Sequence, residues 1–104
     1  MRATSIPASW AAAYIGIPFT MNGRERRDGL DCWGLVRLVY AERFGILLPS
    51  HADGYQGVDD SAGLRRVLVH EMQVRRAWSR IEVDDIEVGD VVQLELAKRP
   101  HVGI

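Results

Sequence analysis

The chain has 104 residues, of which 47% are hydrophobic and 26% charged, and its formal net charge at pH 7 is −1. This length suits one domain and is too short for two, and the near-neutral charge argues against a nucleic-acid partner held by a basic surface. The single cysteine, Cys32, excludes an internal disulfide and a cysteine-rich zinc site. We therefore expect one globular domain over residues 1–104, with no metal or other cofactor.

The first predicted element is a short amphipathic helix that begins at Ser5 or Pro7 and runs to about Ile15, where Gly16 ends it. Its apolar stretch is far shorter than the ~20 residues of a membrane span. No basic leader followed by a longer apolar region indicates a secretory signal. The sequence therefore predicts neither membrane insertion nor export, and a loop rich in Gly, Pro and Arg is expected over residues 17–30.

The second predicted helix begins after Asp31, a residue type favoured at the N-cap position. Its apolar residues recur at the spacing of a core-facing stripe: Leu35, Val36, Val39 and Tyr40. Gly45 stands where a left-handed C-terminal cap is expected.

The second half of the chain changes from helical to strand patterning. After an irregular stretch, a third helix is predicted for residues 61–76. From Trp78 the hydrophobic period becomes two, which predicts strands at 78–83, 91–97 and 101–104 joined by tight turns. Helices followed by strands indicate an α+β domain. Because the last predicted strand has no turn or polar tail after it, we expect the natural domain to continue beyond residue 104.

Cys32 follows the predicted N-cap directly, and this position allows two interpretations. In the first turn of a helix, unpaired backbone N–H groups and the helix dipole favour an anion and can lower a thiol pKa. The backbone N–H of Cys32 could also receive a developing oxyanion. Alternatively, Cys32 is an inert buried side chain, since free cysteine is among the most buried residue types. The position alone leaves both interpretations open.

A cysteine nucleophile needs a base, and three histidines are available. His51 lies in a predicted loop, and His70 lies on the third predicted helix beside its apolar stripe. His101 begins a predicted strand directly after a tight turn, and rigid strands position catalytic groups better than loops do. His101 is therefore the preferred candidate.

Three motifs, in this order along the chain, resemble the NlpC family of cysteine peptidases. They are Asp31-Cys32-Trp33-Gly34-Leu35, then Gly89-Asp90, then His101-Val102-Gly103-Ile104. The tryptophan after the cysteine and the run LVRLVY…GILLPS are similar to the phage-tail and gene-transfer-agent branch of that family. The resemblance extends from about Trp10 to the end of the chain.

The resemblance implies a papain-like fold in which N-terminal helices pack on a small antiparallel sheet, with further strands beyond residue 104. It implies hydrolysis of amide bonds in peptidoglycan stem peptides, with Cys32 as nucleophile, His101 as base and the Cys32 backbone N–H in the oxyanion hole. Phe19, Trp33 and Arg27 are the candidate substrate contacts, although a cluster of arginines such as Arg24, Arg26 and Arg27 is more often a solvated charge run.

Two departures from the family pattern are visible. The third polar residue that orients the histidine in the family would follow residue 104. Phe19 also stands where many members carry a tyrosine, so the hydroxyl is missing.

The resemblance implies a peptidase at the tip of a virion tail, made in the host cytoplasm, with tail hub or tip proteins and stem peptides as partners. The lack of a signal is compatible with delivery by a virion. A second hypothesis is a structural or assembly component of the tail that keeps the fold with little activity. A third is a cytosolic acyltransferase or amidase on the same scaffold.

Overall fold

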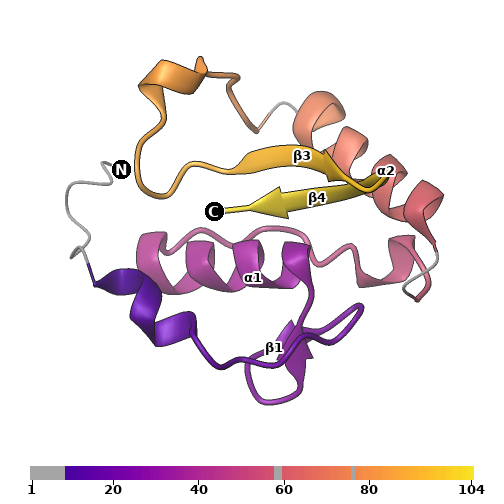
Figure 1. Cartoon of the computed structure of the whole chain (residues 1–104), viewed down its shortest axis with the longest axis horizontal. Coiled ribbons are helices and arrows are strands. Elements are labelled where there is room, and N and C mark those ends of the chain that lie inside the picture. Colours follow the sequence, from indigo (N-terminus) through magenta and orange to yellow (C-terminus); the bar gives the residue numbers. More distant parts are fainter. Residues whose placement is uncertain (1–8, 58–59, 76) are drawn as a thin grey trace.

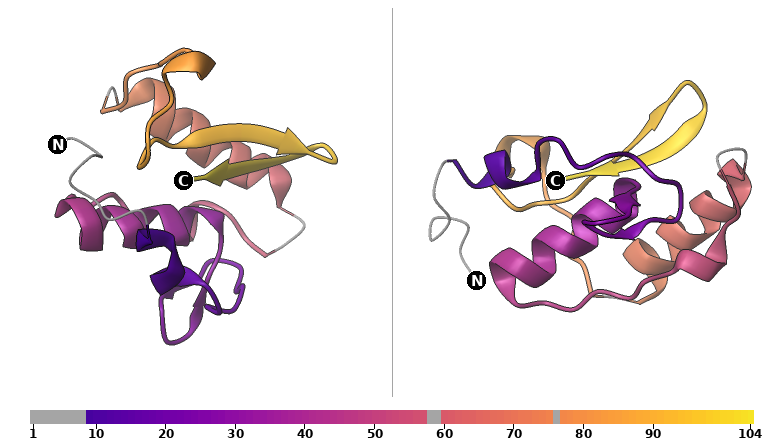
Figure 2. Two further views of the ribbon diagram at one scale, coloured as in Figure 1. Left: turned by 60° about the vertical axis from the view of Figure 1, so that its left-hand side comes forward. Right: turned by 90° about the horizontal axis from the view of Figure 1, so that it is seen from below.

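The computed structural model describes residues 9–57, 60–75 and 77–104 and has an α+β architecture (Figure 1). Helices α1 (Cys32–Val39) and α2 (Ser61–Val69) both contact strand β4 (Arg99–Gly103), which pairs with β3 (Val92–Leu96) in an antiparallel sheet. The predicted fold class, with helices packed on a small antiparallel sheet, is thereby confirmed. Residues 9–30 lie on the side of α1 that faces away from the β3–β4 hairpin (Figures 1 and 2).

Helix α1 begins and ends where the sequence predicts. The Asp31 carboxylate caps it by accepting a hydrogen bond from the Gly34 backbone N–H at 2.8 Å. The helix continues as a π-helical turn, η3 (Tyr40–Phe44), and ends at Gly45, whose φ of 67° is the left-handed cap conformation. Its buried apolar face carries Trp33, Val36 and Val39.

Helix α2 is capped in the same way by Asp60, which accepts a hydrogen bond from the Gly63 backbone N–H at 2.9 Å. It continues as a second π-helical turn, η5 (His70–Val74), so the third predicted helix is confirmed over its described length. Its apolar face meets that of α1 and the inner face of β4. The resulting core consists of Trp33, Val36, Leu48, Tyr55, Leu64, Val67, Leu68 and Val102.

The β3–β4 hairpin holds His101 opposite Leu94. Ala97 and Lys98 both have positive φ, at 52° and 66°, as the tight two-residue hairpin turn requires. Strand β4 begins earlier than predicted and includes Pro100. Proline is tolerated at an edge of a sheet, and within the described residues β4 pairs with β3 alone.

Three predicted segments differ from the structure. The first predicted helix is only a 3-10 turn, η2 (Trp10–Tyr14), and its predicted start lies outside the described residues. The predicted loop contains a small hairpin, β1 (Arg24–Glu25) and β2 (Gly29–Leu30).

The predicted strand over residues 78–83 was wrong, because this segment packs against η5 instead of pairing with the sheet. The Trp78 indole N–H donates to Glu71 at 2.8 Å. A 3-10 turn, η6 (Val83–Asp85), follows, and a shorter one, η4 (Ala52–Gly54), lies in the loop before α2. In the described parts of the chain, no helix has the length and apolar character to cross a membrane.

Candidate active site

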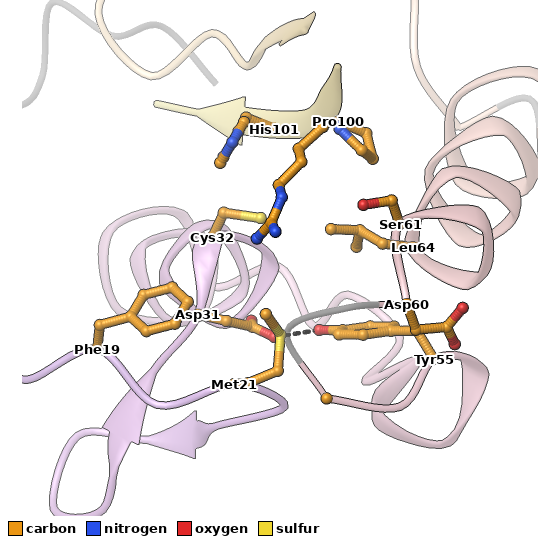
Figure 3. Close-up of a pocket in the computed structure, with 12 residues that line it drawn as sticks. Phe19, Met21, Asp31, Cys32, Tyr55, Asp60, Ser61, Leu64, Pro100 and His101 are labelled. Atoms are coloured by element: carbon orange, nitrogen blue, oxygen red, sulfur yellow. Dashed lines mark hydrogen bonds between the residues drawn. The ribbon is translucent and has the colours of Figure 1, made fainter. Parts of the chain in front are cut away.

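Cys32 is the first residue of α1, and its half-buried side chain lies at a cavity of about 150 Å³ (Figure 3). The wall is mainly apolar and comes from the loop before β1, the loop before α2, helix α2 and strand β4. The lining residues are Phe19, Met21, Asp31, Cys32, Tyr55, Gly57, Asp60, Ser61, Leu64, Arg99, Pro100 and His101.

His101 lines the same cavity from strand β4, above Cys32 in the view of Figure 3. The strand is close to the thiol, because the backbone N–H of Val102 hydrogen-bonds to the Cys32 sulfur. The fold therefore brings the predicted nucleophile and the predicted base to one cavity, from a helix start and from a neighbouring strand.

The thiol does not have the lowered pKa that the first of the two interpretations of its position allows. Burial raises the pKa of Cys32, and the adjacent Asp31 carboxylate raises it further. Hydrogen bonds from the backbone N–H groups of Val102, Trp33 and Cys32 act in the opposite direction without outweighing these effects. At neutral pH the thiol is therefore protonated, and attack on a substrate needs a base that removes its proton.

Beneath Cys32, the buried Asp31 carboxylate is held by four hydrogen bonds. Besides the capping bond from Gly34, it accepts the Asn22 backbone N–H at 2.9 Å and Arg24 Nη1 at 2.8 Å. The Tyr55 hydroxyl donates the fourth (Figure 3). Asp31 thus connects the loop before β1, the loop before α2 and the start of α1.

Arg24 and Tyr55 are site residues that the sequence reasoning missed. The arginine cluster was visible, but nothing in the sequence distinguished Arg24, which turns inward, from its exposed neighbours Arg26 and Arg27. Burial and the hydrogen bond to the Asp31 carboxylate both raise the pKa of Tyr55, which keeps its hydroxyl a donor. A tyrosine hydroxyl therefore does lie at the cavity, although it comes from the loop before α2 and not from the segment around Phe19.

The three predicted substrate contacts lie in three different environments. Phe19 lines the cavity and is 66% exposed, so a ligand could contact it. Trp33 is 0% exposed and donates from its indole N–H to the Pro49 carbonyl at 2.9 Å. The structure corrects the prediction for Trp33, because a fully buried core residue cannot touch substrate. Arg27 is exposed between β1 and β2 and is not among the residues that line the cavity.

The other two histidines do not line this cavity. The His51 ring bonds to the buried Glu71 carboxylate at 2.8 Å and packs against the Trp33 ring, with the ring centroids 5.8 Å apart. His70 is exposed on η5. The preference for His101 among the three histidines therefore agrees with its position.

A helix-borne cysteine followed in the chain by a strand-borne histidine, both at one cavity of an α+β domain, is the arrangement of a papain-like domain. The sequence profile of the NlpC/P60 family matches residues 16–104, and the chain belongs to this family.

A curated relative is the gamma-DL-glutamyl hydrolase of Bacillus subtilis (strain 168). It is 33% identical over 57 residues, which is 55% of this chain and 14% of the relative. The chain therefore spans only a small part of the length of that protein. No solved structure matches the chain.

Proposed function

We propose that this chain is a cysteine peptidase domain that hydrolyses amide bonds in peptidoglycan stem peptides, with Cys32 as nucleophile and His101 as base. The observation that carries the proposal is the shared cavity: both side chains line it within a domain of the NlpC/P60 family. The raised pKa of the thiol makes the base necessary, because the protonated thiol is a weak nucleophile.

The proposed reaction has two steps. In the first, His101 removes the thiol proton as the Cys32 sulfur bonds to the amide carbonyl carbon. The C–N bond then breaks, the proton passes from His101 to the leaving amine, and an acyl-enzyme remains. In the second, His101 takes a proton from water, the water oxygen bonds to the acyl carbon, and the proton returns to the departing sulfur. The Cys32 backbone N–H, at the start of α1, is the proposed donor to the oxyanion in both steps.

The bond that we propose is cleaved is inferred from the name of the relative. The relative is named a gamma-DL-glutamyl hydrolase, and this name supports cleavage at a glutamyl bond of the stem peptide, such as the bond between D-glutamate and diaminopimelate. The exposed Phe19 ring, which lines the cavity, is the proposed contact for the peptide.

The finer biological role that we propose is cell-wall penetration by a phage-tail or gene-transfer-agent particle. Support comes from the sequence around the nucleophile, where Trp33 follows Cys32 and the run LVRLVY…GILLPS continues. In this role the protein is made in the host cytoplasm, is carried at the tail tip, and binds tail hub or tip proteins.

Two observations favour a second candidate function, a structural or assembly component of the tail with little activity. The pKa of Cys32 is raised, and Phe19 stands where many members of the family carry a tyrosine. Under this alternative, the fold serves protein–protein contacts and the cavity is a remnant.

The two functions are separated by incubating the full-length protein with γ-D-glutamyl stem peptides and following release of the amine. The first predicts turnover that is lost in Cys32→Ala and in His101→Ala, together with a covalent adduct in the wild type that mass spectrometry detects. If the wild-type and Cys32→Ala proteins both show no turnover, the enzyme function is excluded and the structural role is favoured.

A further inference from the structure

Arg24 on β1 is ion-paired with Asp31, the residue before the candidate nucleophile, and its side chain is 10% exposed. Its Nε donates to the Ser50 carbonyl at 2.8 Å, and its Nη2 donates to the Tyr55 hydroxyl at 2.7 Å. Its Nη1 donates to the Gly23 carbonyl and to the Asp31 carboxylate, both at 2.8 Å. All three guanidinium nitrogens are bonded inside the protein, so Arg24 acts on protein groups and not on substrate.

The group that receives this charge is the carboxylate next to Cys32. The Asp31 side chain is 2% exposed and is ion-paired with Arg24. Charge-assisted hydrogen bonds of this kind are strong and geometrically specific, and removal of one partner from a buried pair leaves a costly uncompensated charge. In this site the uncompensated charge would lie one residue from the thiol.

Arg24 also joins two segments that are distant in sequence. Through the Ser50 carbonyl and the Tyr55 ring, 5.6 Å from the guanidinium carbon, it holds the loop before α2 against the start of α1. That loop carries Tyr55 and Gly57, which form part of the cavity wall. The same side chain therefore affects both the charge and the shape of the site.

We propose that Arg24 is a positioning residue of this site: it balances the Asp31 charge beside the Cys32 thiol and, with Tyr55, fixes the wall of the substrate cavity. The inference rests on the proposed role of Cys32 as nucleophile. It assigns a function to an arginine that neither touches the cavity nor forms part of the Cys-His pair.

The expected consequence is electrostatic. Without Arg24, the Asp31 charge acts on the thiol more strongly and opposes formation of the thiolate. The other titratable or charged groups that line the cavity around the thiol are Tyr55, Asp60, Arg99 and His101. None of these four residues is substituted in the test variants. A change in the rate of Cys32 alkylation is therefore assigned to the substitutions at Arg24 and Asp31.

The experiment measures the rate of Cys32 alkylation by iodoacetamide against pH, on the full-length protein. For Arg24→Gln we expect the rate profile to move to higher pH by about one unit, which is about a tenfold slower alkylation at neutral pH. Arg24→Lys keeps the charge and should recover most of the rate. Arg26→Gln is the matched control, because Arg26 lies on the same hairpin in an exposed pair with Glu42 and should leave the profile unchanged.

A double variant separates charge balance from a merely structural role. The double variant Arg24→Gln with Asp31→Asn leaves no charge of the pair without its partner, so the protein should fold. Its alkylation profile should lie at the same pH as that of the wild type or at a lower pH. On stem peptides, Arg24→Gln should lower kcat more than it raises KM.

Two results would overturn the proposal: an unchanged alkylation profile in folded Arg24→Gln, or a double variant that stays as slow as the single one. If Arg24→Gln does not fold, Arg24→Lys and the double variant still decide the question. Alkylation needs no turnover, so a wild-type protein that cleaves no stem peptide would contradict the proposed function without obscuring this result.

Discussion

Two buried carboxylates, Asp31 and Glu71, are held in similar ways at different places in the molecule. Asp31 is 3% exposed and bonds to an arginine, a tyrosine hydroxyl and two backbone N–H groups. Glu71 is 0% exposed and bonds to His51, to Arg75 and to the Trp78 indole N–H. Both satisfy the rule that a buried charge needs a counter-charge and hydrogen bonds.

The difference between them lies in the neighbouring groups. Glu71 joins the loop before α2, the η5 turn and the segment after it, and it does not line the cavity at Cys32. Asp31 is followed directly by Cys32, and its charge raises the pKa of the thiol. The same type of interaction therefore serves only stability at Glu71, whereas at Asp31 it also tunes a reactive group.

The largest expected effect on stability is that of Glu71→Gln. Loss of the charge breaks the pairs with His51 and Arg75, and breaking a buried ion pair costs about 3 kcal/mol. The free energy of unfolding, measured by urea denaturation, should fall by this amount. Cys32 alkylation should keep its wild-type pH profile while the protein remains folded. A stability loss below about 1 kcal/mol would be that of an exposed pair and would contradict the assignment of Glu71 as a buried anchor.

A smaller loss of stability is expected for Asp31→Asn, because asparagine also caps helices well. We expect a decrease of at most about 3 kcal/mol, the lower end for a broken buried ion pair, because the asparagine side chain can still accept the bonds from the Gly34 N–H and the Tyr55 hydroxyl. Unlike Glu71→Gln, this variant should also react faster at neutral pH, since removal of the adjacent negative charge lowers the thiol pKa. Urea denaturation and iodoacetamide kinetics on the same sample test both effects. Unchanged or slower alkylation would remove the distinction between the two carboxylates.

The acid stability of the wild type provides a third comparison. Burial opposes ionisation of Glu71, but hydrogen bonds from His51, Trp78 and Arg75 outweigh it and lower its pKa. Because the unfolded chain has the ordinary glutamate pKa of ~4.3, the stabilisation by Glu71 is fully present above that pH. It is lost as the pH falls through the lower pKa of the folded state. The urea midpoint of unfolding should therefore fall less steeply between pH 6 and pH 3 in Glu71→Gln than in the wild type. Parallel curves of midpoint against pH for the two proteins would argue against a lowered pKa of Glu71.

The sequence predicted one of these two clusters in part and the other not at all. Asp31 was identified as a helix cap, because capping is a local property of residue type and position. Its pairing with Arg24 and Tyr55 depends on two loops whose paths are set by tertiary packing, so no periodicity reveals it. His51 and Trp78 were interpreted as a loop histidine and a strand residue, since the partner that unites them, Glu71, lies on a helix between them.

The fold was more predictable than the site. The helices with apolar stripes and capping residues and the β3–β4 hairpin agree with their sequence patterns, because period and turn chemistry are encoded locally. The pairing of Cys32 with His101 came from motif order and is compatible with their shared cavity. The thiol pKa could not be predicted, since it depends on burial and on the net effect of opposing neighbours.

The smallest expected effect concerns an exposed ion pair that also links a helix to a strand. Arg65 on α2 bonds to both carboxylate oxygens of Glu95 on β3, and the two side chains are 43% and 53% exposed. Water screens such a pair, and holding two long side chains in place costs entropy, so Glu95→Gln should lower stability by only about 0.5 kcal/mol. The difference in the free energy of unfolding between this variant and the wild type should be smaller still in about 1 M salt, where the Debye length is near 3 Å. A loss as large as that of Glu71→Gln would mean that geometry, and not burial, decides the strength of these charge pairs, and the contrast with the two buried carboxylates would fail.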